Sequence, residues 1–156
     1  MKLRICAVGR LRAGPEKALV DDYLDRFFKT GRALGLGPCD VIEVEDRKGG
    51  GKAAEAALLQ KSIPNGALCV ALDERGTPMA SPRFAETLLA WRDEGQRDIA
   101  FLIGGADGLD PALVARARLT LSFGKMVWPH MLARVMLAEQ IYRAATILAG
   151  TPYHRS

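Results

Sequence analysis

Two uninterrupted apolar runs constrain the fold more than any other feature of the sequence. Residues 67–73 read ALCVALD and residues 98–103 read DIAFLI, so each run has the length of a strand and almost no polar face. A strand that is apolar on both faces has to be covered on both faces, which is typical of a parallel sheet with helices on either side. The two runs therefore predict an α/β fold.

Strand and helix patterns alternate through the rest of the chain, which strengthens that prediction. We expect strands over residues 2–9, 40–46, 67–73, 98–103 and 119–123. We expect helices over residues 15–31, 53–61, 111–117 and 131–149, and one that begins at Pro82 with Ser81 as its N-cap. At this length the chain buries about two-thirds of its unfolded surface. Residues 1–156 are therefore predicted to form one domain, with a mostly parallel sheet and helices on both faces.

Three connections leave the C-terminal ends of predicted strands. They follow Leu72, begin at Gly104-Gly105, and run from Phe123 to Pro129. Ligands of open α/β sheets bind outside the C-terminal ends of the strands. If the strands concerned are neighbours, these three loops converge on one crevice.

The third of these loops, within LSFGKMVWPH at 121–130, carries Phe123, Met126, Val127 and Trp128. Connecting loops normally run over the surface and are polar. An apolar loop must cover the protein's own core, a partner subunit, or a ligand with a flat apolar part. The sequence alone leaves these three readings open.

The glycines at 104, 105 and 108 do not form a dinucleotide fingerprint, because the first two are adjacent and no long βαβ continuation follows. A P-loop is excluded for lack of Gly-Lys-Ser/Thr. The glycines do let a ligand approach the backbone closely. Asp107 and Asp110 are most simply helix caps, and no hydrolytic constellation stands out.

The net charge of +4 suits an anionic partner such as RNA, although many ordinary proteins share it. The segment RKGGGK at 47–52 is either a clamp on phosphates or a solvated linker. Cys6, Cys39 and Cys69 are scattered, which predicts reduced thiols in the cytoplasm and no metal site. No segment has the character of a signal peptide or a membrane span.

The last predicted helix is apolar almost all the way round. A narrow polar stripe remains, made of Arg134, Glu139, Gln140, Arg143 and Thr146. A helix that is apolar on more than one face is buried on more than one side. We infer that one side packs on the sheet and the other on a second copy of the chain, burial wholly within one chain being the alternative. Glu139 and Arg143 are spaced to pair.

Three segments together resemble a known family. LIGGADGL at 102–109, the run from LSFGKMVWPH to EQIYRA at 121–144, and PYHR at 152–155 are similar to SPOUT-class methyltransferases that modify pseudouridine in large-subunit ribosomal RNA. The resemblance covers the whole chain, from KLRICAVG at 2–9 onward. It implies methyl transfer from S-adenosylmethionine to N3 of a pseudouridine, a homodimer, and a C-terminal trefoil knot, which is a rare exception among folds.

The resemblance also implies where the site lies. The cofactor is expected on Leu72, Gly104, Gly105, Phe123, Gly124, Lys125, Met126, Val127 and Trp128. In the tail, His154 is a candidate base, Arg155 a group that stabilises an anion or grips phosphate, and Tyr153 a stacking or anchoring residue.

A short protein that recognises one site in a very large RNA is expected to read the assembled ribosome, with Arg10, Arg12, Arg47, Lys48 and Lys52 available to contact RNA. Val127 stands where relatives often carry threonine, so a side-chain hydroxyl contact to the cofactor is not expected here. Two alternatives stay open at this point. One is methylation of another RNA such as transfer RNA, and the other is a dimeric ribosome-binding factor without catalysis.

Overall fold

The computed structural model describes residues 1–155, and its centre is a parallel sheet of five strands in the order β2-β1-β4-β3-β5. The strands are β1 (Lys2–Val8), β2 (Cys39–Val44), β3 (Leu68–Pro78), β4 (Asp98–Ile103) and β5 (Leu119–Ser122). The helices are α1 (Pro15–Gly31), a 3₁₀ turn η1 (Arg32–Leu34), α2 (Gly51–Ser62), α3 (Ser81–Asp93), α4 (Pro111–Arg116) and α5 (His130–Ala149). Ser156, the last residue of the predicted domain, lies outside the described residues.

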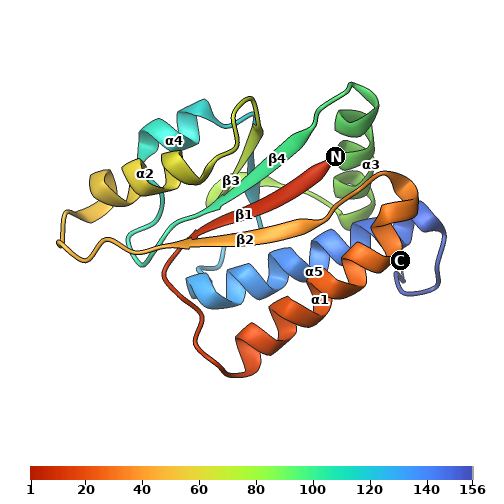
Figure 1. Ribbon diagram of the computed structural model, residues 1–156, viewed down its shortest axis with the longest axis horizontal. Helices are drawn as coiled ribbons and strands as arrows, with labels where there is room; N and C mark the ends of the chain where they lie inside the picture. Colours follow the sequence, from red (N-terminus) through yellow and green to blue (C-terminus); the bar gives the residue numbers. More distant parts are fainter. Residues whose placement is uncertain (156) are drawn as a thin grey trace.

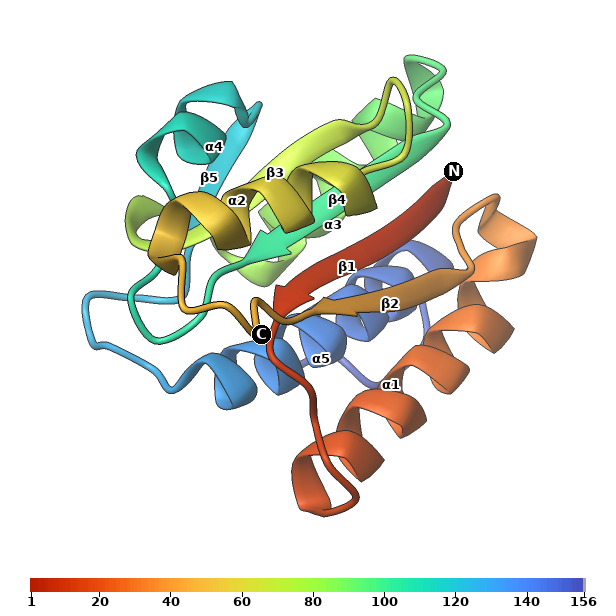
Figure 2. The ribbon, with the colours of Figure 1, turned by 60° about the vertical axis from the view of Figure 1, so that its left-hand side comes forward.

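Helices cover both faces of this sheet, as Figures 1 and 2 show. The central strand β4 explains the arrangement: Ile99, Phe101 and Ile103 belong to the core cluster shared with α1, α3 and α5. Ala100 and Leu102, which alternate with them, belong to the cluster shared with α2 and α4. Successive side chains of a strand point to opposite faces, so an uninterrupted apolar run fills both layers. The predicted fold class is confirmed.

Strand β3 runs further than the apolar run that predicted it, and it is interrupted. Leu72 and Thr77 both align with Leu121 of β5, so residues 73–76 leave the ladder as a bulge. Gly76 lies in this bulge, where a Cβ atom would stand 2.5 Å from the backbone oxygen of Thr120. The bulge can rejoin β5 only because position 76 has no side chain.

Three helix starts differ from expectation. Ser81 does not cap α3, because Ala80 is the N-cap residue and the Ser81 hydroxyl donates to Oε1 of Gln140 at 2.6 Å. A tertiary hydrogen bond to α5 thus replaces the local one. Helix α2 begins at Gly51, two residues early, after a turn in which the Asp46 carboxylate accepts the N–H groups of Lys48 and Gly50. Helix α5 begins one residue early, at His130.

The two aspartates near α4 behave differently from each other. Asp110 caps the helix as predicted, because its carboxylate accepts the N–H of Ala112 at 2.8 Å. Asp107 lies three residues before the cap, exposed in the preceding turn, and it is not the N-cap. The expectation that both residues are caps is therefore wrong for Asp107.

Two members of the polar stripe of α5, Arg134 and Thr146, are buried. Arg134 is 0% exposed, which places it in the interior. Its guanidinium pairs with Glu43 at the end of β2, so burial is compensated by an opposite charge. By contrast, Glu139 and Arg143 pair as the spacing predicts, at 2.7 Å. Within residues 1–155, no helix is both long and apolar enough to cross a membrane.

A glycine-to-alanine change tests the close approach in the β3 bulge. Gly76→Ala should lower the free energy of unfolding by about 1–3 kcal/mol, the usual cost of overpacking, because the Thr120 backbone cannot move aside cheaply. Urea denaturation measures this. Gly14→Ala is the control, since a Cβ there meets nothing nearer than 3.8 Å. Equal stabilities for the two variants would contradict the described packing.

Candidate functional site

The loops that follow β3, β4 and β5 line one pocket at the C-terminal edge of the sheet. In Figure 2 the connections after β4 and β5 lie next to each other at the left of the molecule. The pocket is lined by Leu72, Asp73, Glu74, Ile103, Gly104, Gly105, Gly108, Leu121, Phe123, Gly124, Met126, Trp128, His130 and Ala133. Because β3 has β4 on one side and β5 on the other, the three loops have to meet there. The predicted convergence is confirmed.

The glycine turn is the most compact wall of this pocket. The N–H of Gly108 donates to the oxygen of Gly105 at 3.0 Å and closes the turn. A Cβ atom on Gly104 would lie 2.5 Å from the carbonyl carbon of Gly108. The backbones at the two ends of the turn are therefore in direct contact, with no room for a side chain between them. Gly108 adopts φ +80°, which glycine tolerates without strain. The wall therefore presents backbone to whatever enters the pocket.

The apolar loop divides its residues between the core and the surface. Phe123 is half-buried and packs against the core cluster. Met126 and Val127 are 74% and 78% exposed, and Trp128 is 42% exposed. The core-capping reading of this loop thus holds for Phe123 only. The three exposed side chains remain free to contact a ligand or a partner.

Hydrogen bonds fix where the loop leaves β5. The Ser122 hydroxyl donates to the backbone oxygen of Glu74 at 3.0 Å and accepts the N–H of Gly124 at 3.0 Å. The first and third loops are thereby joined at their bases. Of the residues predicted for the cofactor, Leu72, Gly104, Gly105, Phe123, Gly124, Met126 and Trp128 line the pocket. Val127 lines a neighbouring cavity instead, and Lys125 is exposed between them.

Asp73 and His130 are among the pocket residues that were not predicted. The Asp73 side chain is only 8% exposed, and both of its oxygens accept hydrogen bonds from Arg75. These bonds hold the pKa of the Asp73 carboxyl below its usual range, and the charge of Lys52 acts in the same direction. Asp73 is therefore ionised at neutral pH. An acidic residue that ends an otherwise apolar strand is the signal that could have identified it.

Acidic side chains line the pocket, whereas basic side chains lie outside it. The acidic side chains that line it are Asp73 and Glu74, and no lysine or arginine lines it. The basic residues lie outside: Arg10 and Arg47 are exposed and share the Glu45 carboxylate at 3.5 and 3.9 Å. Because Arg75 compensates the charge of Asp73, Glu74 is the lining residue that offers a carboxylate to a cationic ligand, and the basic side chains outside suit a polyanion.

The C-terminal tail is held against the middle of α5. The Tyr153 hydroxyl donates to Oε1 of Glu139 at 2.9 Å, and the Tyr153 ring lies 4.7 Å from the ring of Tyr142. Nη1 of Arg143 contacts Nδ1 of His154 at 3.2 Å, and its guanidinium lies over the Tyr153 ring. Glu139 and Arg143, predicted only as a helix pair, therefore organise the tail. Arg155 is exposed.

Within one chain the tail and the pocket lie apart. In Figure 1 the C-terminus is at the right, below the last turns of α5, whereas α5 begins at the left beside the pocket loops. Tyr153, His154 and Arg155 are not among the pocket residues. The predicted catalytic and cofactor-binding residues thus form two separate groups.

A second, larger cavity lies between these two groups. Its volume is about 550 Å³, and it lies where α1, α3 and α5 meet, with an apolar lining that includes Leu19, Met79, Phe84 and Met136. Leu121, Phe123 and Gly124 line this cavity as well as the pocket. Glu139, the acceptor for the tail, lines it too. Among residues 1–155 there is no group of three or more side chains placed to hold a metal ion.

A family model and individual relatives point to the same family of methyltransferases. The family model described as "Predicted SPOUT methyltransferase" matches residues 1–154. The chain is 72% identical to "Ribosomal RNA large subunit methyltransferase H" of Dinoroseobacter shibae over 155 residues, which cover 99% of each chain. It is 67% identical to the protein of the same name from Roseobacter denitrificans over 156 residues, which cover 100% of each.

Two solved structures share the fold at low sequence identity. A probable methyltransferase from Bordetella pertussis Tohama I has a TM-score of 0.56 at 14% identity, covering 92% of this chain and 95% of that one. A probable methylase family protein from Haemophilus influenzae Rd KW20 has a TM-score of 0.52 at 13% identity, covering 99% of this chain and 70% of that one.

The bond from Tyr153 to Glu139 can be removed alone. Tyr153→Phe should weaken tail docking by about 1 kcal/mol, the usual net value of such a hydrogen bond, while the ring stays in place. Amide hydrogen exchange of residues 151–155 should then become faster. Arg155→Ala serves as the control with unchanged exchange, and equal exchange in Tyr153→Phe and the unmodified protein would contradict the described contact.

Alkaline pH should release the tail in the same way. Burial and the neighbouring Glu139 carboxylate raise the pKa of the Tyr153 phenol above its usual value of about 10. The folded protein therefore keeps this proton where an unfolded chain loses it, so the contribution to stability is present below the usual tyrosine pKa and is lost as pH rises further. In a tyrosinate absorbance titration, one of the three tyrosines should ionise last. The Tyr153→Phe protein should lack that step, and its persistence would refute the assignment.

Proposed function

The chain belongs to the SPOUT methyltransferase family, and from this premise we propose that it methylates large-subunit ribosomal RNA with S-adenosylmethionine as donor. The observation that carries the proposal is the single pocket formed by the loops after β3, β4 and β5. The names of the relatives support ribosomal RNA as the substrate. We assign N3 of a pseudouridine as the acceptor and the assembled ribosome as the particle that is recognised.

The pocket offers the apolar, backbone and acidic contacts that this cofactor requires. Phe123, Met126 and Trp128 offer apolar contacts for the adenosyl group, and the Gly104-Gly105 backbone allows close approach. Of the acidic side chains that line the pocket, Asp73 is paired with Arg75, whereas Glu74 offers a carboxylate to a sulfonium cation. When bound, the cofactor supplies an electrophilic methyl group. Val127 faces the neighbouring cavity and Lys125 is exposed, so both would contribute through their backbone.

The protein's task in such a reaction is to position the nucleophile and receive a proton. Attack by N3 on a methyl group needs an in-line approach and the loss of the N3 proton. In the docked tail, Arg143 can only donate, so Nδ1 of His154 is an acceptor and the ring proton is on Nε2. His154 can therefore take a proton only after Nδ1 separates from Arg143. In the docked tail Nε2 is buried and makes no hydrogen bond within residues 1–155, so contact with an oxygen beside N3 also requires the tail to move.

A homodimer would bring the two groups of site residues together. We propose that the tail of one copy completes the pocket of the other, with Arg155 and Tyr153 contacting the RNA. The support is the separation of tail and pocket within one chain, together with the apolar cavity of α1, α3 and α5 that reaches from Phe123 to Glu139. A second copy packed over this cavity would cover the exposed Leu19.

Two further features belong to the proposal. The C-terminal trefoil knot is supported by membership of the SPOUT family. A trace of an experimental structure with the ends pulled apart tests it. Residues 1–156 are proposed to act as one domain in the cytoplasm, where ribosomes and S-adenosylmethionine are present.

The substrate assignment predicts a direct result. Ribosomes purified from a strain that lacks this protein should accept a labelled methyl group, and mapping should place it on a pseudouridine of the large-subunit RNA. Methylation of transfer RNA instead would favour the first alternative. Absence of transfer to any RNA would favour a non-catalytic ribosome-binding factor.

Mixing two inactive variants tests the shared site. Gly104→Ala disrupts the pocket and His154→Ala removes the tail imidazole, so each homodimer should be inactive. A 1:1 mixture that exchanges subunits should recover about a quarter of the unmodified activity, because half of the dimers are mixed and each of these has one intact site. No recovery, with exchange verified by light scattering of tagged subunits, would show that each site is built within one chain.

A further inference from the structure

Arg134 is a buried cation at the point where β1, β2 and α5 meet. It is the largest fully buried side chain of the protein, at 0% exposure. Its Nη1 donates to Oε2 of Glu43 at 2.7 Å, and its Nη2 donates to the backbone oxygens of Gly9 at 3.0 Å and Val8 at 3.3 Å. A buried charge is tolerated only with such pairing, and an apolar side chain would fill the same space at lower cost. The charge therefore calls for an explanation beyond packing.

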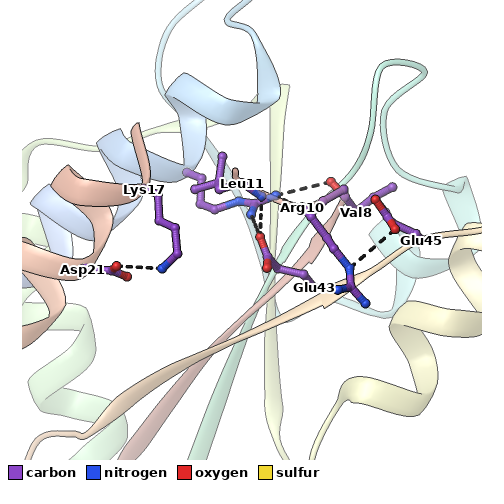
Figure 3. A network of polar contacts seen from close by, with 9 residues as sticks. Val8, Arg10, Leu11, Lys17, Asp21, Glu43 and Glu45 are labelled. Carbon is purple, nitrogen blue, oxygen red and sulfur yellow. Dashed lines mark hydrogen bonds and ion pairs between the residues drawn. The ribbon is translucent and has the colours of Figure 1, made fainter. Parts of the chain in front are cut away.

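The same carboxylate oxygen also holds the loop after β1. Oε2 of Glu43 accepts the N–H of Leu11 at 2.7 Å in addition to the bond from Arg134. Figure 3 shows Glu43 next to Leu11, near Val8 at the end of β1. Arg134 holds the Gly9 carbonyl at one end of this short segment, and Glu43 holds Leu11 at the other. Residues 9–12 are thus held in place by two side chains that are distant in the sequence.

This segment carries basic side chains that face outward. Arg10 and Arg12 are exposed, and Arg10 reaches Glu45 at 3.5 Å. Exposed arginines beside a site that acts on RNA contact phosphates. The bonds to Gly9 and Leu11 therefore determine where these two arginines are presented.

Arg134 is also tied to the pocket. It lies one helical turn after His130, so the two side chains lie on the same side of α5. His130 and Ala133 line the pocket, and a Cβ on Gly9 would be 3.7 Å from Nε2 of His130. Arg134 therefore anchors the first turn of α5, and with it the end of the loop that contains Trp128, to the end of β1.

We propose that Arg134 and Glu43 are a positioning pair, which holds the cofactor pocket and the basic segment 9–12 in fixed relation so that the methyl donor and the RNA meet in register. The proposal rests on the proposed function. Neither residue is among those that line the pocket. Their loss should therefore reduce productive alignment and not simply unfold the protein.

The decisive variant replaces the pair by apolar residues. Arg134→Met with Glu43→Leu removes both charges, and such exchanges of buried pairs are often neutral for stability. We expect the double variant to unfold at a urea concentration close to that of the unmodified protein. Its kcat/KM on ribosomes should still fall roughly 10- to 100-fold, because small misplacements of reacting groups carry such penalties. A stable double variant with unmodified kcat/KM would overturn the proposal.

Matched single variants guard against a folding artefact. Glu43→Gln and Asp40→Asn make the same change on the same strand, and Asp40 pairs with Arg4 of β1 at 2.9 Å away from the pocket. Glu43→Gln should raise KM for ribosomes, and Asp40→Asn should leave both kcat and KM unchanged. An equal effect of the two changes would mean that any β1–β2 pair matters, which contradicts a positioning role.

Hydrogen exchange needs no RNA, so it tests the positioning pair independently of the methyltransferase activity. Hydrogen exchange of residues 9–12 should be faster in Glu43→Gln, and exchange of residues 123–130 should be faster in Arg134→Met. Asp40→Asn should change neither. If the unmodified protein methylates no RNA while these changes occur, the proposed function fails and the structural coupling stands. If exchange is unchanged in both segments, the positioning pair is refuted whatever the activity.

Discussion

The parallel sheet with both faces covered is the constraint on which the rest of the structure depends. Since β3, β4 and β5 are parallel neighbours, their C-terminal ends open at one edge. Three connections that are separated by up to about fifty residues of sequence consequently form one pocket. The bulge at residues 73–76 and the Gly104–Gly108 turn border this pocket, whose walls are built largely from backbone and apolar side chains. Position within the sheet, more than any single side chain, creates the pocket.

Much of this organisation was predictable, because it follows from local patterns. The apolar runs at 67–73 and 98–103 predicted strands buried on two sides, and the loops after Leu72, Gly104 and β5 were correctly expected to converge. What the sequence could not reveal were partners distant in the chain. Ser81 looked like a cap but bonds to Gln140, and Arg134, predicted only as part of a polar stripe, pairs with Glu43, ninety-one positions away. Such contacts depend on how α5 packs against α3 and against the sheet, which no local period in the sequence encodes.

The tail illustrates the same limit at the site itself. The family resemblance pointed to Tyr153, His154 and Arg155, and the structure adds the residues that hold the first two of them. Glu139 and Arg143 were visible in the sequence only as a helix pair, yet Tyr153 and His154 rest on them. In one chain this group lies apart from the pocket. The mechanism therefore depends on whether a second copy brings the tail and the pocket together. Arg134 and Glu43, on the other side of α5, address the complementary problem of holding the pocket itself in place.

The central claim is that the three-loop pocket binds S-adenosylmethionine. Calorimetric titration of S-adenosylmethionine into the purified protein and into its Gly104→Ala variant tests it most directly. In this variant the added Cβ would collide with the backbone of Gly108, 2.5 Å away, and push the glycine turn out of place. We predict saturable binding by the unmodified protein and its loss in Gly104→Ala, with the variant still folded. Equal binding by both proteins, or no binding by the unmodified protein with or without ribosomes, would contradict the account.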